Sequence, residues 1–350
     1  MTSKERVLTA CRHEETDRVP LQIYLTPEVR ARLQDHFGER DLLEALGIDL
    51  RHVGAPCTAE CQPGPGLPGE ADHYDLWGVG YTNTQYQGGA YPEATELPFA
   101  QIDSLAAVEA YPWPSADDYD YSGLRERAEA VGDHAVVFGG AGIPDIVNGV
   151  SRGRGMERVL TDIMTSDPVG VAIIDRRVEH YYEHCRRALA AAGDAIDILH
   201  LGEDCGDQRG RLFPPRVFDD FFVPRLKRFI DLAHEYDCLA MLHSCGDTHD
   251  IMPTFIEMGL DILDAMQPEP AGMDAATIKR EFGRDLTFCG LISTQQTLPH
   301  GSPEDVPREV RERIEVMGEG GGYILAPAHC IQPDTPLENV LAMYDEALAS

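Results

Sequence analysis

The sequence contains no run of about 18 or more apolar residues, so it offers no ordinary membrane-spanning helix. Residues 1–6 lead directly into charged helical sequence and have no apolar signal core, which favours a cytoplasmic protein. Basic residues are also scarce: 29 Lys and Arg stand against 60 Asp and Glu, for a net charge of −31. A chain this acidic repels polyanions, so we expect neither nucleic acid nor an anionic membrane surface as a partner.

Disulfide bonds and the common nucleotide motifs are also missing. Nine cysteines are spread over 350 residues, and this odd, scattered set does not form a disulfide framework. It favours a reducing compartment. The sequence has no Gly-x-Gly-x-x-Gly opening a helix after a strand, no Walker A loop and no Gly-x-Ser-x-Gly elbow. The usual signs of a dinucleotide enzyme, an NTPase or an α/β-hydrolase are therefore absent.

What is present is an alternation of short apolar strands with longer amphipathic helical stretches. Such alternation predicts a parallel sheet with helices outside it. Eight strand–helix units in this length favour a single (β/α)₈ TIM barrel over residues 1–350, with a doubly wound open sheet as the alternative. The expected strands are at 19–24, 51–55, 135–139, 196–202, 239–244, 262–266, 287–291 and 322–326.

One segment interrupts the alternation. Residues 73–99 carry Trp77, Tyr81, Tyr86 and Tyr91 among glycines and threonines, which is typical of a β-hairpin. We therefore expect a hairpin excursion after the second strand. Insertions of this kind often cover the active site of a barrel.

Residues that bind metals follow two of the expected strands. His243 and Cys245 are two positions apart at a strand end, so their side chains point the same way. Cys330 follows the last strand, which in a closed barrel faces the fifth strand across the mouth. Imidazole and thiolate suit Zn²⁺, and three protein ligands leave one position open for chemistry. The alternative is a structural histidine with small buried cysteines.

Other polar residues gather at the same ends of the strands. In a barrel these carboxyl ends form the active-site face. Those that follow the expected strands are Glu203, Asp204, Gln208, Asp247, Gln267 and Glu269.

The sequence resembles the uroporphyrinogen decarboxylase superfamily over nearly its whole length. The resemblance is most specific in the C-terminal half, as in the run His-Ser-Cys-Gly-Asp at 243–247. It implies a (β/α)₈ barrel. The residues that carry it are 4–7, 17–20, 243–247, 272–274, 321–327, 332–336 and 338–339.

The superfamily has two main chemistries, and the sequence departs from one of them. Its porphyrinogen decarboxylases use no metal and carry an Arg-Gln-Ala-Gly-Arg-type motif after the first strand. Residues 22–28 contain no arginine here, which argues against decarboxylation. The other branch, the corrinoid-dependent methyltransferases, binds zinc through a His-x-Cys pair and a distant Cys. Resemblance to that branch implies zinc on His243, Cys245 and Cys330, with Glu269 favoured over Glu203 as a fourth ligand.

The resemblance thus implies a zinc-dependent methyltransferase. It would move a methyl group between a small methylated donor, or a thiol acceptor, and the cobalt of a separate corrinoid protein, with no protein nucleophile. We expect Asp204, Gln208 and Gln267 to position the substrate, and Asp247 to orient a zinc ligand. The alternatives are a metal-free decarboxylase-like lyase and a non-catalytic barrel that binds a small molecule.

Overall fold

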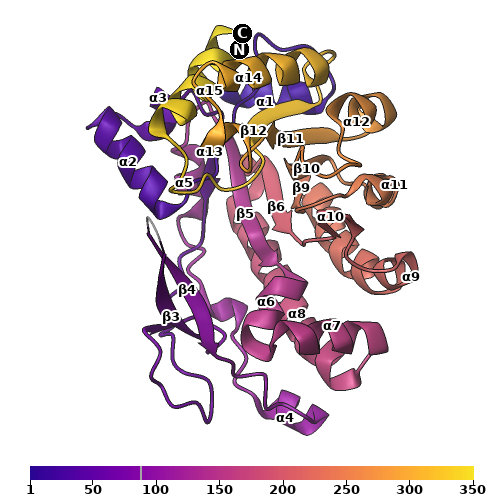
Figure 1. Cartoon of the computed structure of the whole chain (residues 1–350). Coiled ribbons are helices and arrows are strands. Elements are labelled where there is room, and N and C mark those ends of the chain that lie inside the picture. The colour runs from indigo at the N-terminus through magenta and orange to yellow at the C-terminus, as the bar shows by residue number, and fades with distance from the viewer. Residues whose placement is uncertain (87–88) are drawn as a thin grey trace.

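The computed structural model describes residues 1–86 and 89–350, and its centre is a curled parallel sheet of seven strands (Figure 1). Neighbouring strands follow chain order in the sheet, without the reversal that a doubly wound sheet requires. The fold is therefore α/β and is consistent with a TIM-like barrel. The sheet strands are β1 (Leu50–Val53), β5 (Ala135–Pro144), β6 (Ile198–Gly202), β9 (Leu239–His243), β10 (Ile262–Met266), β11 (Thr287–Ile292) and β12 (Tyr323–Pro327).

The expected first strand at 19–24 forms only isolated bridges, yet it connects the two edges of the sheet. Leu21 bridges Leu325 of β12 in parallel, and Leu25 bridges Ile331. On the other side, the Asp49 N–H donates to the Leu21 carbonyl at 2.9 Å, just before β1. A regular ladder does not form around this point because Pro20 has no N–H to donate.

Helices surround the sheet, with α8 the longest of them in the described part of the chain. None of the described helices combines the length and apolarity that a membrane crossing requires. The α-helices are α1 (Ser3–Cys11), α2 (Pro27–Phe37), α3 (Leu42–Ala45), α4 (Leu105–Ala110), α5 (Leu124–Glu129), α6 (Ile146–Arg154), α7 (Met156–Thr165), α8 (Pro168–Ala192), α9 (Pro215–Val217), α10 (Val223–Glu235), α11 (Met252–Met258), α12 (Ala275–Phe282), α13 (Thr297–His300), α14 (Asp305–Met317) and α15 (Leu337–Ala349). Short 3₁₀ turns span Ala116–Asp118, Gly193–Ala195 and His249–Ile251, and a π-helical turn spans Phe218–Phe222.

A small antiparallel sheet of β2 (His73–Tyr74), β3 (Gly80–Tyr86) and β4 (Gly89–Glu96) follows β1. The tip of the expected hairpin, 87–88, lies outside the described residues. In Figure 1 this sheet lies beside the end of β5 from which α6 begins, and the Phe99 N–H donates to the Gly153 carbonyl of α6. Trp77 is buried at its base, whereas Tyr86 and Tyr91 are exposed. A second two-stranded antiparallel piece joins β7 (Gly206–Asp207) and β8 (Gly210–Arg211).

The interior of the curled sheet is one layer of buried apolar side chains with Val7 of α1 among them. Because side chains on one face recur every second residue, the next inward-facing positions can be read from the sequence. Two residues after Ile198, Met241 and Ile262 come His200, His243 and Asp264. The apolar layer therefore supports a polar layer near the carboxyl ends of the strands.

Residues 19–24 close the sheet and are called the closing segment. Asp49 attaches this segment to the start of β1, and this contact gives the first testable prediction. Its fully buried carboxylate accepts hydrogen bonds from Arg6 at 2.6 Å, from Arg18 at 2.8 Å and from the Leu21 N–H at 2.8 Å. Removing one partner of a buried charge network leaves the rest unpaired, so Asp49→Ala should lower the free energy of unfolding by about 3–5 kcal/mol. Urea unfolding measures this change.

Glu129→Ala is the matched control, because it removes a carboxylate from an exposed Arg125 pair and should cost about 1 kcal/mol or less. Equal losses in the two variants would contradict a structural role for Asp49.

Candidate metal centre

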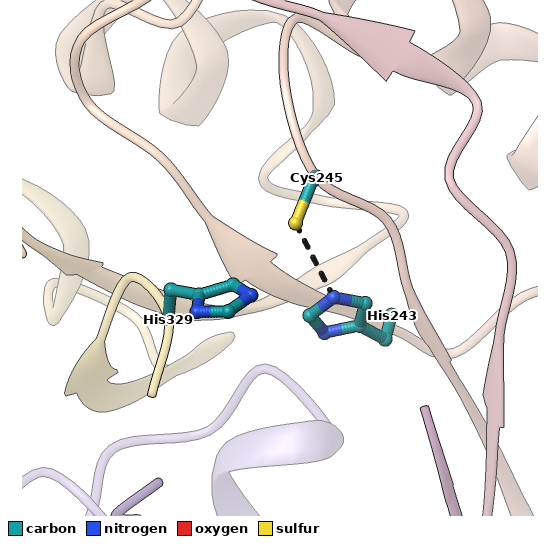
Figure 2. A group of neighbouring side chains, drawn as sticks. All are labelled: His243, Cys245 and His329. Atoms are coloured by element: carbon teal, nitrogen blue, oxygen red, sulfur yellow. Dashed lines mark hydrogen bonds between the residues drawn. The ribbon is translucent and has the colours of Figure 1, made fainter. Parts of the chain in front are cut away.

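Three potential ligands converge at the carboxyl ends of β9 and β12 (Figure 2). His243 is the last residue of β9, Cys245 is two positions later, and His329 lies in the loop after β12. One ligand atom from each lies within 4.8 Å of the other two. Figure 2 shows the His243 and His329 side chains extending toward each other, with the Cys245 sulfur directed toward His243.

The spacing within this group suits a metal ion. Ligand atoms on one tetrahedral zinc, bound at 2.0–2.3 Å, are separated by about 3.5 Å. His243 Nε2 and Cys245 Sγ are 3.4 Å apart. The same-side geometry expected for the His-x-Cys pair is therefore present in the structure.

Asp264 orients the His243 ring from the interior of the barrel. Its Oδ2 lies 3.1 Å from His243 Nδ1, so Nδ1 carries the proton and Nε2 is directed toward Cys245. Its Oδ1 accepts a hydrogen bond from Tyr24 at 2.7 Å, and His200 Nε2 is 3.2 Å from Oδ2. A carboxylate that holds one imidazole nitrogen while the other faces a metal is a recurrent arrangement in zinc proteins.

Asp204 fixes the other ligand of the pair. Its Oδ1 accepts the Cys245 backbone N–H at 3.0 Å and lies 4.0 Å from His243 Nε2. Its Oδ2 accepts a hydrogen bond from Asn148 of α6 at 2.9 Å. Asp204 therefore borders the candidate centre directly.

The charges of the site are strongly coupled. Burial acts to lower the pKa of His243, but the hydrogen bonds to Asp264 and Cys245 outweigh it and raise that pKa well above the usual range. Burial acts to raise the pKa of Cys245, but His243 and His329 lower it overall. Burial also opposes ionisation of Asp264, yet hydrogen bonds from His200 and His243 hold its pKa well below the usual range. The thiol is therefore poised to ionise.

Two cavities flank the group and share His243 and His329. The smaller one, the acidic cavity, has a volume of about 210 Å³ and is bordered by Asp145, Glu203 and Asp204. The larger one, the inner cavity, has a volume of about 400 Å³. Its walls include Tyr24, Leu25, Arg30, His52, His200, Asp264 and Cys330.

Cys330 lies close to the candidate centre but not within the converging group. It borders the inner cavity together with His243 and His329, and burial raises the pKa of its thiol. In the described structure the neighbouring His329 supplies the third ligand atom. The expected strand-end position is thus occupied by two adjacent potential ligands, His329 and Cys330, of which the sequence prediction named only Cys330.

The two glutamates considered for a fourth position differ in their surroundings. Glu203 is fully buried, borders the acidic cavity and accepts the Ile146 N–H at 2.5 Å and the Val147 N–H at 3.2 Å at the start of α6. Burial raises the pKa of Glu203 well above its usual range. Glu269 accepts a hydrogen bond from Ser293 through Oε1, while its Oε2 is buried without a partner among the described residues. Neither is in a metal-capable group of described residues.

The remaining expected residues support the loop after β9. Gln267 accepts hydrogen bonds from the Gly246 N–H at 3.1 Å and from Gln208 at 2.8 Å. Asp247 accepts the Gly272 N–H at 3.1 Å and the His249 N–H at 3.1 Å. Asp264, and not Asp247, is hydrogen-bonded to His243. The structure thus places the orienting carboxylate on β10.

Asp264 and the position of His329 in the converging group were not predicted from the sequence. Asp264 lies within β10 and does not follow a strand. The period-two alternation of inward-facing positions would have found it, since Ile262 belongs to the apolar layer. His329 and Cys330 are adjacent in an irregular loop, where no periodicity indicates which side chain points toward His243.

Comparisons with known proteins show which family the chain belongs to. Over 132 residues this chain is 32% identical to a methylcobamide:CoM methyltransferase of Methanosarcina barkeri. Over 134 residues it is 28% identical to a methylated-thiol–coenzyme M methyltransferase of Methanosarcina mazei. These matches cover 38% and 37% of this chain and 36% and 32% of the relatives, so the chain spans about a third of their length.

A uroporphyrinogen decarboxylase of Pseudoalteromonas translucida is 21% identical over 175 residues, which are 48% of this chain and 44% of that protein. The fold resembles a solved methyltransferase from Methanosarcina mazei with a TM-score of 0.66, at 20% identity, over 100% of this chain and 99% of the other. The family model described as uroporphyrinogen decarboxylase (URO-D) matches residues 80–349. The chain therefore belongs to the uroporphyrinogen decarboxylase family.

Proposed function

We propose that this protein is a zinc-dependent methyltransferase that works with a separate corrinoid protein. The observation that carries the proposal is the convergence of His243 Nε2, Cys245 Sγ and a His329 nitrogen. Two relatives are named as methyltransferases, one for methylcobamide and the other for a methylated thiol, which supports this chemistry.

The proposed zinc ligands are His243, Cys245 and Cys330, with His329 as the rival for the third position. Two thiolates and a neutral imidazole leave Zn²⁺ with no net charge, so a thiol bound there would ionise and still retain nucleophilicity. Glu269 is the proposed displaceable fourth ligand, since its buried Oε2 has no partner among the described residues.

The protein's own residues hold the reacting parts in place. Asp264 fixes the His243 ring and its tautomer, and Asp204 fixes the backbone of Cys245. Asp204 also borders the acidic cavity, where it contributes to substrate positioning. Gln267 and Gln208 act less directly, by stabilising the loop at Gly246.

The proposed reaction transfers a methyl group from the cobalt of the corrinoid to the sulfur of the acceptor thiol. The acceptor thiol loses its proton to solvent, and its sulfur lone pair forms the new S–C bond. The cobalt–carbon bond of the methylated corrinoid breaks, and both of its electrons stay with cobalt as Co(I). In the opposite direction a methyl group leaves its donor oxygen or sulfur for Co(I), and the donor retains the bonding pair.

Metal content gives the first prediction from this proposal. The purified protein should contain about one Zn²⁺ per chain, and His243→Ala and Cys245→Ala should lose it because each removes a ligand from a three-residue set. Plasma emission spectrometry on dialysed protein measures the content.

Two further variants assign the third ligand. Loss of zinc in Cys330→Ala with retention in His329→Ala supports Cys330, and the reverse pattern assigns His329. Wild-type protein that remains metal-free after incubation with Zn²⁺ would refute the proposal.

Asp264→Asn gives the second prediction. The amide retains the shape of the side chain but no longer stabilises the tautomer of His243 as a carboxylate does, so zinc affinity should fall by about 10–100-fold. Competition with a chromophoric chelator measures the affinity.

Asp261→Asn is the matched control, because Asp261 also pairs with a histidine, His234, at 2.8 Å, but just before β10 begins and apart from the candidate centre. An equal loss of affinity in both variants would show that the Asp264 contact has no specific role.

Turnover gives the third prediction. Zinc-loaded protein should demethylate free methylcobalamin in the presence of a small thiol, and His243→Ala should abolish this reaction because the thiol is no longer activated. The fall in methylcobalamin absorbance measures the rate. A rate in His243→Ala equal to that of the wild type would exclude a role for the metal centre in transfer.

A further inference from the structure

The acidic cavity contains a carboxylate that the proposed zinc chemistry does not use. Asp145 lies between β5 and α6 and is only 5% exposed, yet it borders the cavity. No hydrogen bond reaches its carboxylate from the described residues, and its one ion pair is a loose contact of 3.8 Å with Arg152. Buried carboxylates are normally hydrogen-bonded, so this loose ion pair leaves the carboxylate of Asp145 open to a hydrogen-bond donor in the cavity.

The backbone at Asp145 supports a functional role. Its φ of +49° lies in the left-handed region, which non-glycine residues adopt rarely and chiefly as Asn or Asp. Such conformations are found at ligand sites, where the surrounding structure holds them in place. Here the conformation places the carboxylate on the cavity wall that also contains Glu203, Asp204 and the metal-binding pair His243 and Cys245.

The charges around the cavity favour a cation. Asp204 contributes a second carboxylate, and Arg152 is the positive side chain on the wall, with 47% of its surface exposed. The carboxyl groups of Asp145, Glu203 and Asp204 thus outnumber the single guanidinium on a wall that also includes His243 and His329.

We propose that the acidic cavity binds the ammonium group of the small substrate, so that the thiol or thioether used by this enzyme carries a protonated amine on a short chain. An ammonium next to Asp145 supplies the missing hydrogen-bond donors, while the sulfur of the same molecule reaches the position beside Cys245. A sulfonate or carboxylate in the same place would meet Asp145 and Asp204, with only the exposed guanidinium of Arg152 to compensate. The volume of about 210 Å³ is below that of pockets for drug-sized ligands, which restricts the substrate to a small molecule.

This inference rests on the proposed zinc methyltransferase activity for the placement of the sulfur, but the ammonium site stands apart from the metal. The test compares three thiols of equal chain length on zinc-loaded protein: 2-aminoethanethiol, 2-mercaptoethanol and 2-mercaptoethanesulfonate. Isothermal titration calorimetry gives the dissociation constants. The aminothiol should bind at least about tenfold more tightly than the neutral thiol, as expected for a charged hydrogen bond, and the sulfonate more weakly than both.

The variant Asp145→Asn decides the assignment. Asparagine tolerates the left-handed conformation, so the fold should be retained while the charge is lost. Because the three thiols differ in acidity, the informative quantity is the ratio of aminothiol to neutral-thiol affinity. This ratio should fall about tenfold in Asp145→Asn. It should be unchanged in Asp250→Asn, which makes the same substitution at an exposed carboxylate.

Arg152→Gln provides an independent variant with an effect of opposite sign. It removes the competing guanidinium from an exposed side chain, so the preference for the aminothiol should increase. A wild-type preference for the sulfonate, or a ratio that does not change in Asp145→Asn and Arg152→Gln, overturns the inference.

The two proposals fail in distinguishable ways. Zinc retained together with neutral-thiol binding but no preference for the amine refutes only the ammonium site. If the protein binds no zinc, saturation-transfer NMR with ethylammonium on the metal-free wild type and Asp145→Asn tests the cavity alone. Equal signals in the two proteins then overturn the inference, and a signal lost in Asp145→Asn supports it.

Discussion

The buried carboxylate of Asp264 is the contact on which the candidate centre depends. It accepts a hydrogen bond from Tyr24, which belongs to the segment that closes the sheet, and it holds His243 at the end of β9. His200 of β6 approaches the same carboxylate at 3.2 Å. One fully buried anion thus connects the closing segment, β6, β9 and β10. Barrel closure and ligand orientation are consequently coupled, because a shift of the closing segment would move Tyr24 and release Asp264.

The fold could be predicted from the sequence because its alternation of strands and helices is regular. Alternation of apolar strands with amphipathic helices gave the parallel sheet, and seven of the expected strands overlap the seven strands of the main sheet. The segment at 19–24 was less regular than expected, since Pro20 interrupts the ladder and leaves bridges at Leu21 and Leu25. Local composition does not show how a closing segment satisfies its hydrogen bonds, because its partners are Leu325 and Asp49, which are distant in sequence.

Only part of the candidate centre could be predicted from the sequence, for a related reason. His243 and Cys245 are neighbours on one strand end, so the period-two rule alone brought their side chains together. The choice between His329 and Cys330 depends on the path of an irregular loop, which no periodicity encodes. The orienting role expected of Asp247 belongs to Asp264, because the inward-facing position two residues after Ile262 lies beside His243. Asp247 instead accepts the N–H of His249 in its own loop and the N–H of Gly272 in the loop after β10.

The two cavities give the centre a consistent chemical environment. A zinc ion held by a ligand set that includes the Cys245 thiolate would favour a soft, nucleophilic substrate atom. The acidic cavity with Asp145 on one side, and the inner cavity with His52 and His200 on the other, restrict what else the substrate carries. The URO-D family fold permits more than one reaction, so the function of this chain has to be argued from these side chains rather than from the barrel.

X-ray absorption spectroscopy at the zinc K-edge of the zinc-loaded protein tests the central claim most directly, because it reports the atoms bound to the metal. The account predicts sulfur at about 2.3 Å and imidazole nitrogen at about 2.0–2.1 Å from zinc, with two sulfurs if Cys330 is the third ligand and one if it is His329. A shell of oxygen and nitrogen atoms with no sulfur would contradict it.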